Sequence, residues 1–355
     1  MVIKNLYIKR WLIYVVVALL LLTSCSNGKS PVETTPSPTP ASVENSGNTD
    51  DTQNGDTIDI TKIDPNVVNP SPLTGLEMNG DYKPVAIMIE NFKAARPQSG
   101  IIDADLVYEA NVEGGITRFL AIFQSKRPEK VGPVRSLRHY FMWLAQEWDA
   151  YLVHYGQSFI AEEYFDKIDV KRLNGFYTDK PFWRDTTRKA PHNVYIDPAT
   201  CLDKIDYKQE AQGFLFDVTK IPDGSPYTDI TIPYYKTITI VTYKYDQKKK
   251  LNLRSINGKP DVDRETGNQL FAKNIIIQYA KHSILEPGAG YRDVKLIDKG
   301  EAQFFINGSY IEGTWERKGA DTKTVYYDDN NNEMYFAPGN TWVQIVQKDM
   351  NVTVK

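Results

Sequence analysis

Short apolar runs separated by turn residues recur from Pro72 to the end of this 355-residue chain, and they constrain its fold more than any other feature. Runs of this length are short for helices and are consistent with buried β-strands. The run at residues 85–89 is continuously apolar, and it is the clearest strand of the first half. Further strands are predicted at residues 106–110, 118–123 and 151–154.

Three helices are predicted between or after these strands. Gly132-Pro133 indicates the start of the first helix, because proline at the first helical position loses no hydrogen bond. A second helix is predicted from Ser158 to about Ile168, and Asp197-Pro198 precedes a short third one. The first helix has an apolar stripe at the 3-4-3-4 spacing of a one-sided helix, made of Val134, Leu137, Phe141, Leu144 and Trp148. Alternating strands and helices predict an α/β domain over residues 72–216.

Strand signals dominate residues 217–355, where no clear helical stripe is present. Residues 237–243 alternate hydroxyl and apolar side chains, as expected of a strand. Asn-Gly pairs at 257–258 and 307–308 predict tight hairpins. Further strands are predicted at residues 251–256, 274–280, 294–297, 303–306 and 342–346. The expected architecture is therefore an α/β N-terminal domain followed by a mostly β (α+β) C-terminal domain.

The first 24 residues have the pattern of a secretion signal. Three basic residues precede 12 apolar residues at 11–22, a length that suits a signal peptide and is short for a membrane-spanning helix. The sequence Leu-Thr-Ser-Cys at 22–25 resembles a bacterial lipobox, in which the cysteine is acylated after cleavage. A plain membrane anchor with an incidental cysteine fits these features less well. We predict lipidation of Cys25 and a lipid-anchored protein on the extracytoplasmic face of the cell membrane.

Residues 25–71 are predicted to form a tether. From Ser26 to Thr57 the chain has no aromatic residue and is rich in Ser, Thr, Pro, Asn, Gly and Asp, so it cannot bury enough apolar surface to fold. A coil of this length averages about 30 Å between its ends. Export implies an oxidising compartment, in which Cys201 is expected to be unpaired and buried.

Composition and motifs argue against several functional classes. The formal charge of −3 becomes −6 when the signal takes three of the 42 Lys and Arg residues, which argues against a general nucleic-acid binder. The sequence has no P-loop, no nucleotide-binding glycine fingerprint and no paired-histidine zinc helix. Residues 261–267 lack the spacing of a calcium loop. We therefore predict no metal, no cofactor and no nucleic-acid partner.

A group of basic residues is the first candidate for a binding site. Arg135, Arg138 and His139 have the spacing of one helical face. They fall in the first two turns of the predicted helix, where free N–H groups already favour an anion. Arginine also binds phosphate or carboxylate through two parallel hydrogen bonds. This pattern predicts an anion site, to which His154 at the end of a strand is added as a candidate.

A second concentration of polar residues occupies the loop from Phe182 to Asn193. His192 is the candidate general acid or base, with Asp185 as the residue that orients it. The loop also contains candidate binding residues, namely Arg184, Arg188 and Asn193. Loops with this variety of polar side chains often form functional sites.

A purely structural interpretation stands beside these site predictions. Arg184 and Asp185 can form an ordinary ion pair, and His139 and His154 can be satisfied core groups. The arginines can pair with Glu90, Glu109 and Glu113, which belong to nearby strands. Clusters of perturbed charged groups also arise from such ion-pair networks.

Longer motifs resemble the YerB-type lipoprotein family of Gram-positive bacteria. The motifs are SPLTGL at 71–76, VEGGITRF at 112–119, VGPVRSLRHYF at 131–141, FWRD at 182–185 and APHNVY at 190–195. The resemblance covers about residues 72–355 and implies an α/β-type domain followed by a smaller C-terminal one, with no known activity. Recurrent polar positions of the family are matched by Arg118, Arg135, Arg138, Arg184, His192 and Asn193, which suggests a shared site.

Three functional hypotheses remain. The leading one is an anchored accessory or binding protein whose cationic cleft binds an anionic envelope component or an envelope protein. The alternative is an enzyme acting on a wall or phosphate-bearing polymer, with His192 as acid and base. The third is a structural module that presents edge strands and aromatic side chains to a protein partner.

Overall fold

The computed structural model describes residues 67–178, 180–210, 213–235, 238–286 and 290–355. The predicted signal peptide, Cys25 and the tether up to residue 66 lie outside these residues. By their internal contacts, the described residues belong to one compact unit. No helix in the described part of the chain is long and apolar enough to cross a membrane.

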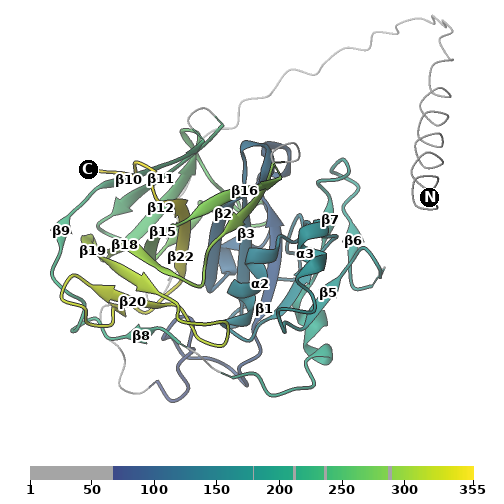
Figure 1. The fold of residues 1–355 in the computed structure, drawn as a ribbon, viewed down its shortest axis with the longest axis horizontal. Helices are drawn as coiled ribbons and strands as arrows, with labels where there is room; N and C mark the ends of the chain where they lie inside the picture. Colours follow the sequence, from purple (N-terminus) through teal and green to yellow (C-terminus); the bar gives the residue numbers. More distant parts are fainter. Residues whose placement is uncertain (1–66, 179, 211–212, 236–237, 287–289) are drawn as a thin grey trace, which may run out of the picture. The chain divides into compact units, whose positions relative to one another are not determined.

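The centre of the fold is a mixed β-sheet of 11 strands, which takes strands from both halves of the sequence (Figure 1). Its order is β20-β19-β18-β15-β22-β2-β3-β1-β4-β5, with β9 paired to β19. The N-terminal half supplies β1 (Val85–Glu90), β2 (Leu106–Asn111), β3 (Thr117–Phe123), β4 (Tyr151–His154) and β5 (Arg172–Asn174). The C-terminal half supplies β9 (Ser225–Pro226), β15 (Asn274–Ala280), β18 (Lys299–Ile306), β19 (Ser309–Glu316), β20 (Val325–Asp328) and β22 (Thr341–Gln347).

Strand β22 joins the two halves, because it pairs in parallel with both β2 and β15. Leu106 lies opposite Thr341 at one end of the β2–β22 register, and Ala110 lies opposite Ile345 at the other. Strands β1 and β2 both run antiparallel to β3, and β4 and β5 run parallel to β1. Six strands, β1, β2, β4, β5, β15 and β22, therefore end on the same side of the sheet, which we call the carboxyl edge.

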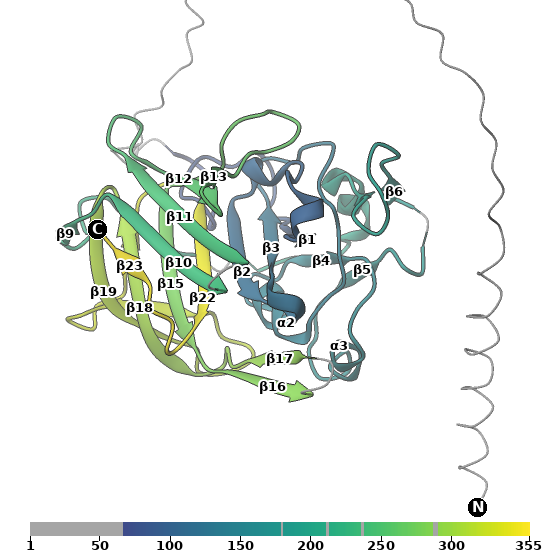
Figure 2. The same ribbon diagram turned by 90° about the horizontal axis from the view of Figure 1, so that it is seen from above.

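An antiparallel sheet from the C-terminal half covers one face of the main sheet (Figure 2). Its order is β13-β12-β11-β10-β23, with β14 paired to β12. Its strands are β10 (Asp229–Tyr235), β11 (Thr239–Asp246), β12 (Leu251–Ile256), β13 (Lys259–Pro260), β14 (Phe271–Ala272) and β23 (Thr353–Val354). The core between the sheets includes Ile230, Val241, Ile275 and Trp342.

The two Asn-Gly turns are confirmed at the positions that the sequence predicts. Asn257 and Gly258 follow β12 with φ of 51° and 76°, and Asn307 and Gly308 join β18 to β19 with φ of 51° and 87°. Asparagine and glycine tolerate this left-handed conformation, which the tightest hairpin turns require.

Short helices contribute to the core on the other face of the main sheet. These are α2 (His139–Gln146) and α3 (Phe159–Glu163), which place Tyr140, Phe141 and Ala161 in that core. As predicted, Ser158 begins α3, and its hydroxyl accepts a hydrogen bond of 3.1 Å from the Ala161 amide. The helix ends at Glu163, before the predicted end near Ile168. The 3₁₀ helices are η2 (Lys93–Ala95), η3 (Ile101–Asp103), η4 (Glu113–Gly115) and η5 (Pro198–Lys204), and η5 begins after Asp197 as predicted.

The prediction that the first helix begins at Pro133 is wrong. Residues 133–138 are extended, and the helix begins at His139. The reason is the free edge of β1 beyond its pairing with β4, which ends at Ile87. There the Glu90 amide donates to the Pro133 carbonyl and the Arg135 amide donates to the Met88 carbonyl, both at 2.9 Å. These sheet hydrogen bonds replace the first turns of the predicted helix.

The described structure is mostly β with few helices. The predicted β-rich C-terminal part is confirmed, and the N-terminal part has a mixed sheet in place of regularly alternating strands and helices. Three two-stranded sheets complete the described structure. They are formed by β6 (Trp183–Arg184) with β7 (Val194–Tyr195), β8 (Leu215–Phe216) with β21 (Tyr335–Phe336), and β16 (His282–Glu286) with β17 (Tyr291–Val294). Cys201 is free and buried, as predicted, and burial raises the pKa of its thiol to about 12.

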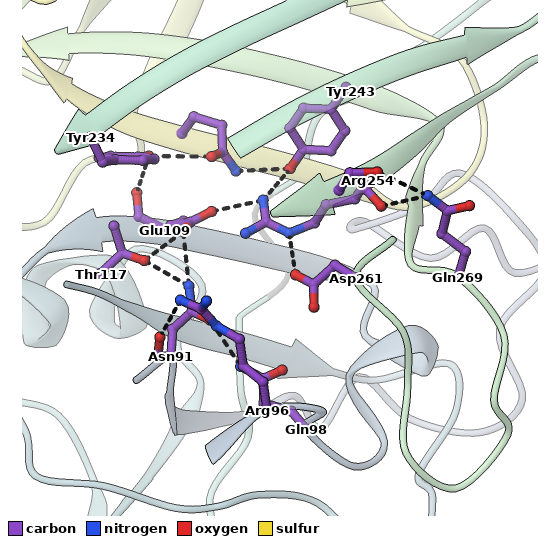
Figure 3. A network of polar contacts seen from close by, with 12 residues as sticks. Asn91, Arg96, Gln98, Glu109, Thr117, Tyr234, Tyr243, Arg254, Asp261 and Gln269 are labelled. Atoms are coloured by element: carbon purple, nitrogen blue, oxygen red, sulfur yellow. Dashed lines mark hydrogen bonds and ion pairs between the residues drawn. The ribbon is translucent and has the colours of Figure 1, made fainter. Parts of the chain in front are cut away.

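A buried ion pair connects the antiparallel sheet to the main sheet (Figure 3). Arg254 on β12 places one guanidinium nitrogen 2.9 Å from Glu109 on β2, and its Nε lies 2.9 Å from Asp261. It also donates to the Tyr243 hydroxyl at 2.9 Å. The side chains of Arg254 and Glu109 have no exposed surface.

The second carboxylate oxygen of Glu109 extends this network into the N-terminal half (Figure 3). It accepts hydrogen bonds from Thr117 at 2.6 Å and from Asn91 at 3.2 Å. Asn91 Oδ1 in turn accepts from Arg96 at 2.9 Å and from Gln98 at 3.0 Å. Both oxygens of the buried Glu109 carboxylate therefore have partners, as a charge out of water requires.

We predict that Arg254→Ala lowers the free energy of unfolding by about 3–5 kcal/mol, because it leaves the buried Glu109 and Asp261 carboxylates without their cation. Urea unfolding of the variant measures this loss. Lys248→Ala, an exposed substitution in the β11–β12 turn, is the control and should change little. An Arg254→Ala protein as stable as this control would mean that the buried pair does not hold the sheets together.

Candidate functional site

The carboxyl edge brings together charged residues from distant parts of the chain. Glu90 ends β1, Asn111 ends β2 and Arg118 lies near the start of β3. The extended segment 133–138 bonds to β1 beside them and carries Arg135 and Arg138. The structure therefore gathers most of the first predicted group, although it does so with an extended segment where a helix was expected.

Glu90 binds two of the predicted site residues at once. Its Oε1 lies 3.2 Å from Arg135 Nε, and its Oε2 lies 2.8 Å from His192 Nδ1. The His192 ring stacks on Phe92 with centroids 5.4 Å apart. Glu90 thus orients the imidazole through Nδ1, and Nε2 has no hydrogen bond among the described residues.

The residue predicted to orient His192, Asp185, binds elsewhere. Asp185 contacts Lys130 at 2.9 Å and accepts hydrogen bonds from the Thr187 amide and hydroxyl at 2.8 and 2.5 Å. The hydrogen bond from the Thr187 hydroxyl and then that from Lys130 lower the pKa of the Asp185 carboxyl. The orienting role therefore falls to Glu90, which is buried next to His192, whereas Asp185 stabilises its own loop.

Arg138 has a full carboxylate partner. Its Nε and one terminal nitrogen donate to Glu113 at 2.8 and 2.7 Å, in the two-bond geometry that arginine favours. Burial alone would lower the pKa of Arg138, but the hydrogen bonds and charge of Glu113 raise it. The structural interpretation is thus correct for Arg138 with Glu113 and for Arg135 with Glu90, whereas Glu109 pairs with Arg254 instead.

Arg118 lacks such a carboxylate. It lies directly opposite Glu90 in the β1–β3 register, but both oxygens of Glu90 contact other residues. Its side chain donates to the Ser136 carbonyl, and its buried Nε has no partner among the described residues. Burial, together with the charges of Arg138 and Arg135, lowers the pKa of Arg118 to about 9, although the charge of Glu113 opposes this shift.

A fourth arginine, Arg292, comes from the C-terminal half. Arg292 lies on β17, its Nε is buried without a described partner, and it forms no ion pair with the described carboxylates. The charges of Arg138, Arg118 and Arg292 all lower the pKa of the Tyr140 hydroxyl, which burial raises more strongly. We call Arg118, Arg138 and Arg292, whose charges all act on Tyr140, the arginine cluster.

The arginine cluster contains a further unpaired group. The Tyr140 hydroxyl donates to the Asn111 carbonyl at 2.6 Å. The Asn111 side chain is completely buried, and neither its Nδ2 nor its Oδ1 has a hydrogen-bond partner among the described residues. Buried amides normally have partners, so Asn111 adds an unused donor and acceptor to this edge.

The two remaining predicted histidines have structural contacts. His139 Nε2 lies 2.8 Å from Asp293 on β17, and its ring stacks on Tyr164 at 4.7 Å. Together with Arg138, which lies 5.9 Å from the Tyr291 ring centroid, this contact ties β17 to the start of α2. His154 is buried, and its Nδ1 lies 2.8 Å from the Gly156 carbonyl. Burial lowers the pKa of His154 to about 4, so it is neutral at physiological pH.

The predicted polar loop forms a separate group around Asn193. Arg184 donates to Asn193 Oδ1 at 2.9 Å, and Asn193 Nδ2 donates to the carbonyls of Asp185 at 3.2 Å and Arg188 at 3.3 Å. Arg188 itself donates to the Ala94 carbonyl at 3.3 Å and to the Pro97 carbonyl. These side chains hold the loop against the domain, and of the residues predicted in it only His192 contacts Glu90.

Asn111, Tyr140 and Arg292 were not predicted as site residues from the sequence. Tyr140 follows the predicted candidate His139, and the motif VEGGITRF begins directly after Asn111. The motifs could therefore have indicated both residues. Arg292 has no such signal, because only the pairing of β22 with β2 brings its half of the chain to this edge.

The two halves of the chain match two domains of a known protein family. The description "Protein of unknown function (DUF3048) N-terminal domain" matches residues 73–213, and the corresponding C-terminal domain matches residues 230–343. The chain belongs to the DUF3048 family. "Putative lipoprotein YerB" from Bacillus subtilis (strain 168) is 38% identical over 287 residues, which are 78% of this chain and 86% of the relative.

A relative in the DUF3048 family has been solved. The crystal structure of YerB protein from Bacillus subtilis matches with a TM-score of 0.71 and 36% identity, and the match covers 80% of this chain and 99% of the solved chain. Almost the whole solved chain therefore corresponds to the folded part of this protein. The predicted family resemblance is confirmed, and no specific activity comes with it.

We predict that Arg138→Ala lowers the free energy of unfolding by about 1–3 kcal/mol, because it leaves the partly buried Glu113 without its donors. Arg118→Gln should cost less, since it breaks no ion pair and removes one of several close positive charges. Urea unfolding of both variants provides the comparison. If Arg118→Gln is the more destabilising of the two, Arg118 has a structural role and is not a free binding group.

Proposed function

We propose that this DUF3048 protein is a lipid-anchored binding protein of the cell envelope, and that its arginine cluster binds an anionic ligand. The anchor is Cys25, at the end of the lipobox-like sequence Leu-Thr-Ser-Cys. The name of the relative as a lipoprotein supports a membrane lipid anchor in the family. Export through this route would place the folded part on the extracytoplasmic face.

The observation that carries the binding proposal is the imbalance of charge in the arginine cluster. The charges of three guanidinium groups act on Tyr140, and one of these groups, that of Arg138, is paired with the Glu113 carboxylate. Arg118 is 4% exposed and has no described carboxylate partner. A buried charge without a counter-ion is costly, and a bound anion would supply the missing negative charge.

The chemistry of the unpaired atoms indicates the class of ligand. The Nε atoms of Arg118 and Arg292 are donors without a described partner, and so is the Nδ2 of Asn111, whose backbone carbonyl accepts from Tyr140. Guanidinium groups match the geometry of phosphate and carboxylate oxygens. The ligand class we propose is therefore a phosphate- or carboxylate-bearing component of the envelope.

We predict that inorganic phosphate or pyrophosphate raises the thermal midpoint of residues 67–355 above that in chloride at equal ionic strength. A ligand that binds only the native state stabilises it by about 2.7 kcal/mol at a hundredfold excess over Kd. Arg118→Gln and Arg292→Gln should each remove most of this rise, because each removes an unpaired donor. Differential scanning calorimetry measures the shift.

Arg184→Gln is the matched control, because Arg184 contacts Asn193 and Tyr155 outside the cluster. It should keep the phosphate-dependent rise. An equal rise in Arg118→Gln, Arg292→Gln and the unchanged protein would show that phosphate binds elsewhere, and the proposed site would be rejected.

The Glu90–His192 contact favours a second candidate function, an enzyme that acts on a wall or phosphate-bearing polymer. A carboxylate that fixes one imidazole nitrogen and leaves the other free is the arrangement of a general base. The side chain of His192 is 20% exposed, so a substrate can reach it. The arginines would then hold the developing oxyanion.

Under this second candidate we predict that residues 67–355 release fragments from purified wall polymer, and that His192→Ala and Glu90→Gln both abolish the release. Both variants should retain the phosphate-induced thermal shift, because neither removes a guanidinium of the cluster. Chromatography of the released fragments is the measurement. Unchanged release by His192→Ala would exclude this residue as the acid and base.

A further inference from the structure

The connection between β5 and β6, together with the first residue of β6, exposes three large aromatic side chains to solvent. Phe176 is 63% exposed, Tyr177 is 71% exposed and Trp183 is 39% exposed. Single exposed apolar residues are common on protein surfaces, whereas several together usually indicate a contact surface. Strand β6, which carries Trp183, lies at the margin of the molecule in both views (Figures 1 and 2).

These aromatic residues are exposed although the chain around them is held in place. The Phe176 amide donates to Asn174 Oδ1 at 3.0 Å, and its ring contacts the Tyr155 ring at 6.2 Å between centroids. The Phe182 ring also contacts the Tyr155 ring, with 5.9 Å between centroids. A Cβ at Gly175 would lie 2.7 Å from both Tyr155 and Phe182, so only glycine permits this close packing. The exposure is therefore built into the local structure.

Exposed basic side chains lie in the same segment of the chain as the exposed rings. Lys180, Arg184 and Lys189 are exposed, and Arg184 lies 5.3 Å from the Tyr155 ring centroid. The nearby Asp185 is paired with Lys130. The segment 175–192 contains four Lys and Arg residues against two Asp, whereas the whole chain carries −3. We call the surface the aromatic–basic patch, made of Phe176, Tyr177, Lys180, Trp183, Arg184 and Lys189.

We propose that the aromatic–basic patch docks on the headgroup region of an anionic lipid bilayer. Aromatic side chains with a polar edge prefer the membrane–water interface, and exposed Lys and Arg residues are attracted to anionic lipids. The tether averages about 30 Å, which keeps the patch within reach of the membrane that holds the anchor. This contact is separate from the arginine cluster and from the lipid on Cys25.

The test uses residues 67–355 without the anchor, which correspond to the solved chain of the relative. Cosedimentation with phosphatidylcholine vesicles, with and without phosphatidylglycerol, gives the partition coefficient. Phe176→Ala with Tyr177→Ala should lower binding to the anionic vesicles about tenfold per ring. Lys180→Gln with Lys189→Gln should lower it about fivefold per lysine.

Matched controls separate these effects from general changes in charge or surface. Lys248→Gln with Lys249→Gln removes two exposed lysines of the β11–β12 turn, and Ile238→Ala removes an exposed apolar side chain elsewhere. These control variants should bind the anionic vesicles as the unchanged protein does. A control variant that loses as much binding as the patch variants would overturn the assignment.

Three results would contradict the docking proposal. The first is equal binding to neutral and anionic vesicles, and the second is unchanged binding by the Phe176→Ala, Tyr177→Ala variant. The third is a dimer of the unchanged protein that this double variant abolishes, which would assign the patch to a second copy. If Arg118→Gln alone removed vesicle binding, the arginine cluster would bind the headgroups and the patch proposal would fail while the proposed function survived.

Discussion

The buried ion pair between Glu109 and Arg254 is the interaction on which the arrangement of the two halves depends. It joins β2 of the main sheet to β12 of the covering sheet at a place without solvent. If one of these two charges were removed, the other would be buried without a partner. The interior between the two sheets is therefore stable only when both sheets are present. Beside it, β22 pairs with β2 in parallel and makes the main sheet continuous across both halves.

The candidate site forms because the main sheet is continuous across both halves of the chain. Arg118 and Arg138 belong to the N-terminal half, whereas Arg292 and Asp293 lie on β17 of the C-terminal half. Their approach at one edge requires that β15 and β22 end on the same side of the sheet as β1 and β2. The contacts of Arg138 with Tyr291 and of His139 with Asp293 then hold β17 against the start of α2. An isolated N-terminal half would lack one of the three guanidinium groups.

The sequence predicted the local elements well where a short-range signal decided them. Apolar runs located β1 to β4, and the Asn-Gly pairs located two turns because their positive φ is a local requirement. The carboxylate partners of Arg135 and Arg138 were among the proposed ones, because Glu90 and Glu113 are near in sequence.

Long-range pairing decided what the sequence did not predict. Residues 133–138 have a helical apolar spacing, but hydrogen bonds to the edge of β1 keep them extended. Arg292 could not be assigned to the site, because its position depends on the parallel pairing of strands that are far apart in the chain. The same applies to Glu109, whose partner Arg254 lies on another sheet.

Anomalous X-ray diffraction from crystals of residues 67–355 grown with selenate tests the central claim most directly, because the selenium atom of this phosphate-like anion is located independently of the protein. The account predicts one strong peak at the arginine cluster, with selenate oxygens within hydrogen-bond distance of Arg118 and Arg292. A structure in which selenate binds only at other surface arginines, while a carboxylate or carbonyl satisfies Arg118 Nε, would contradict it.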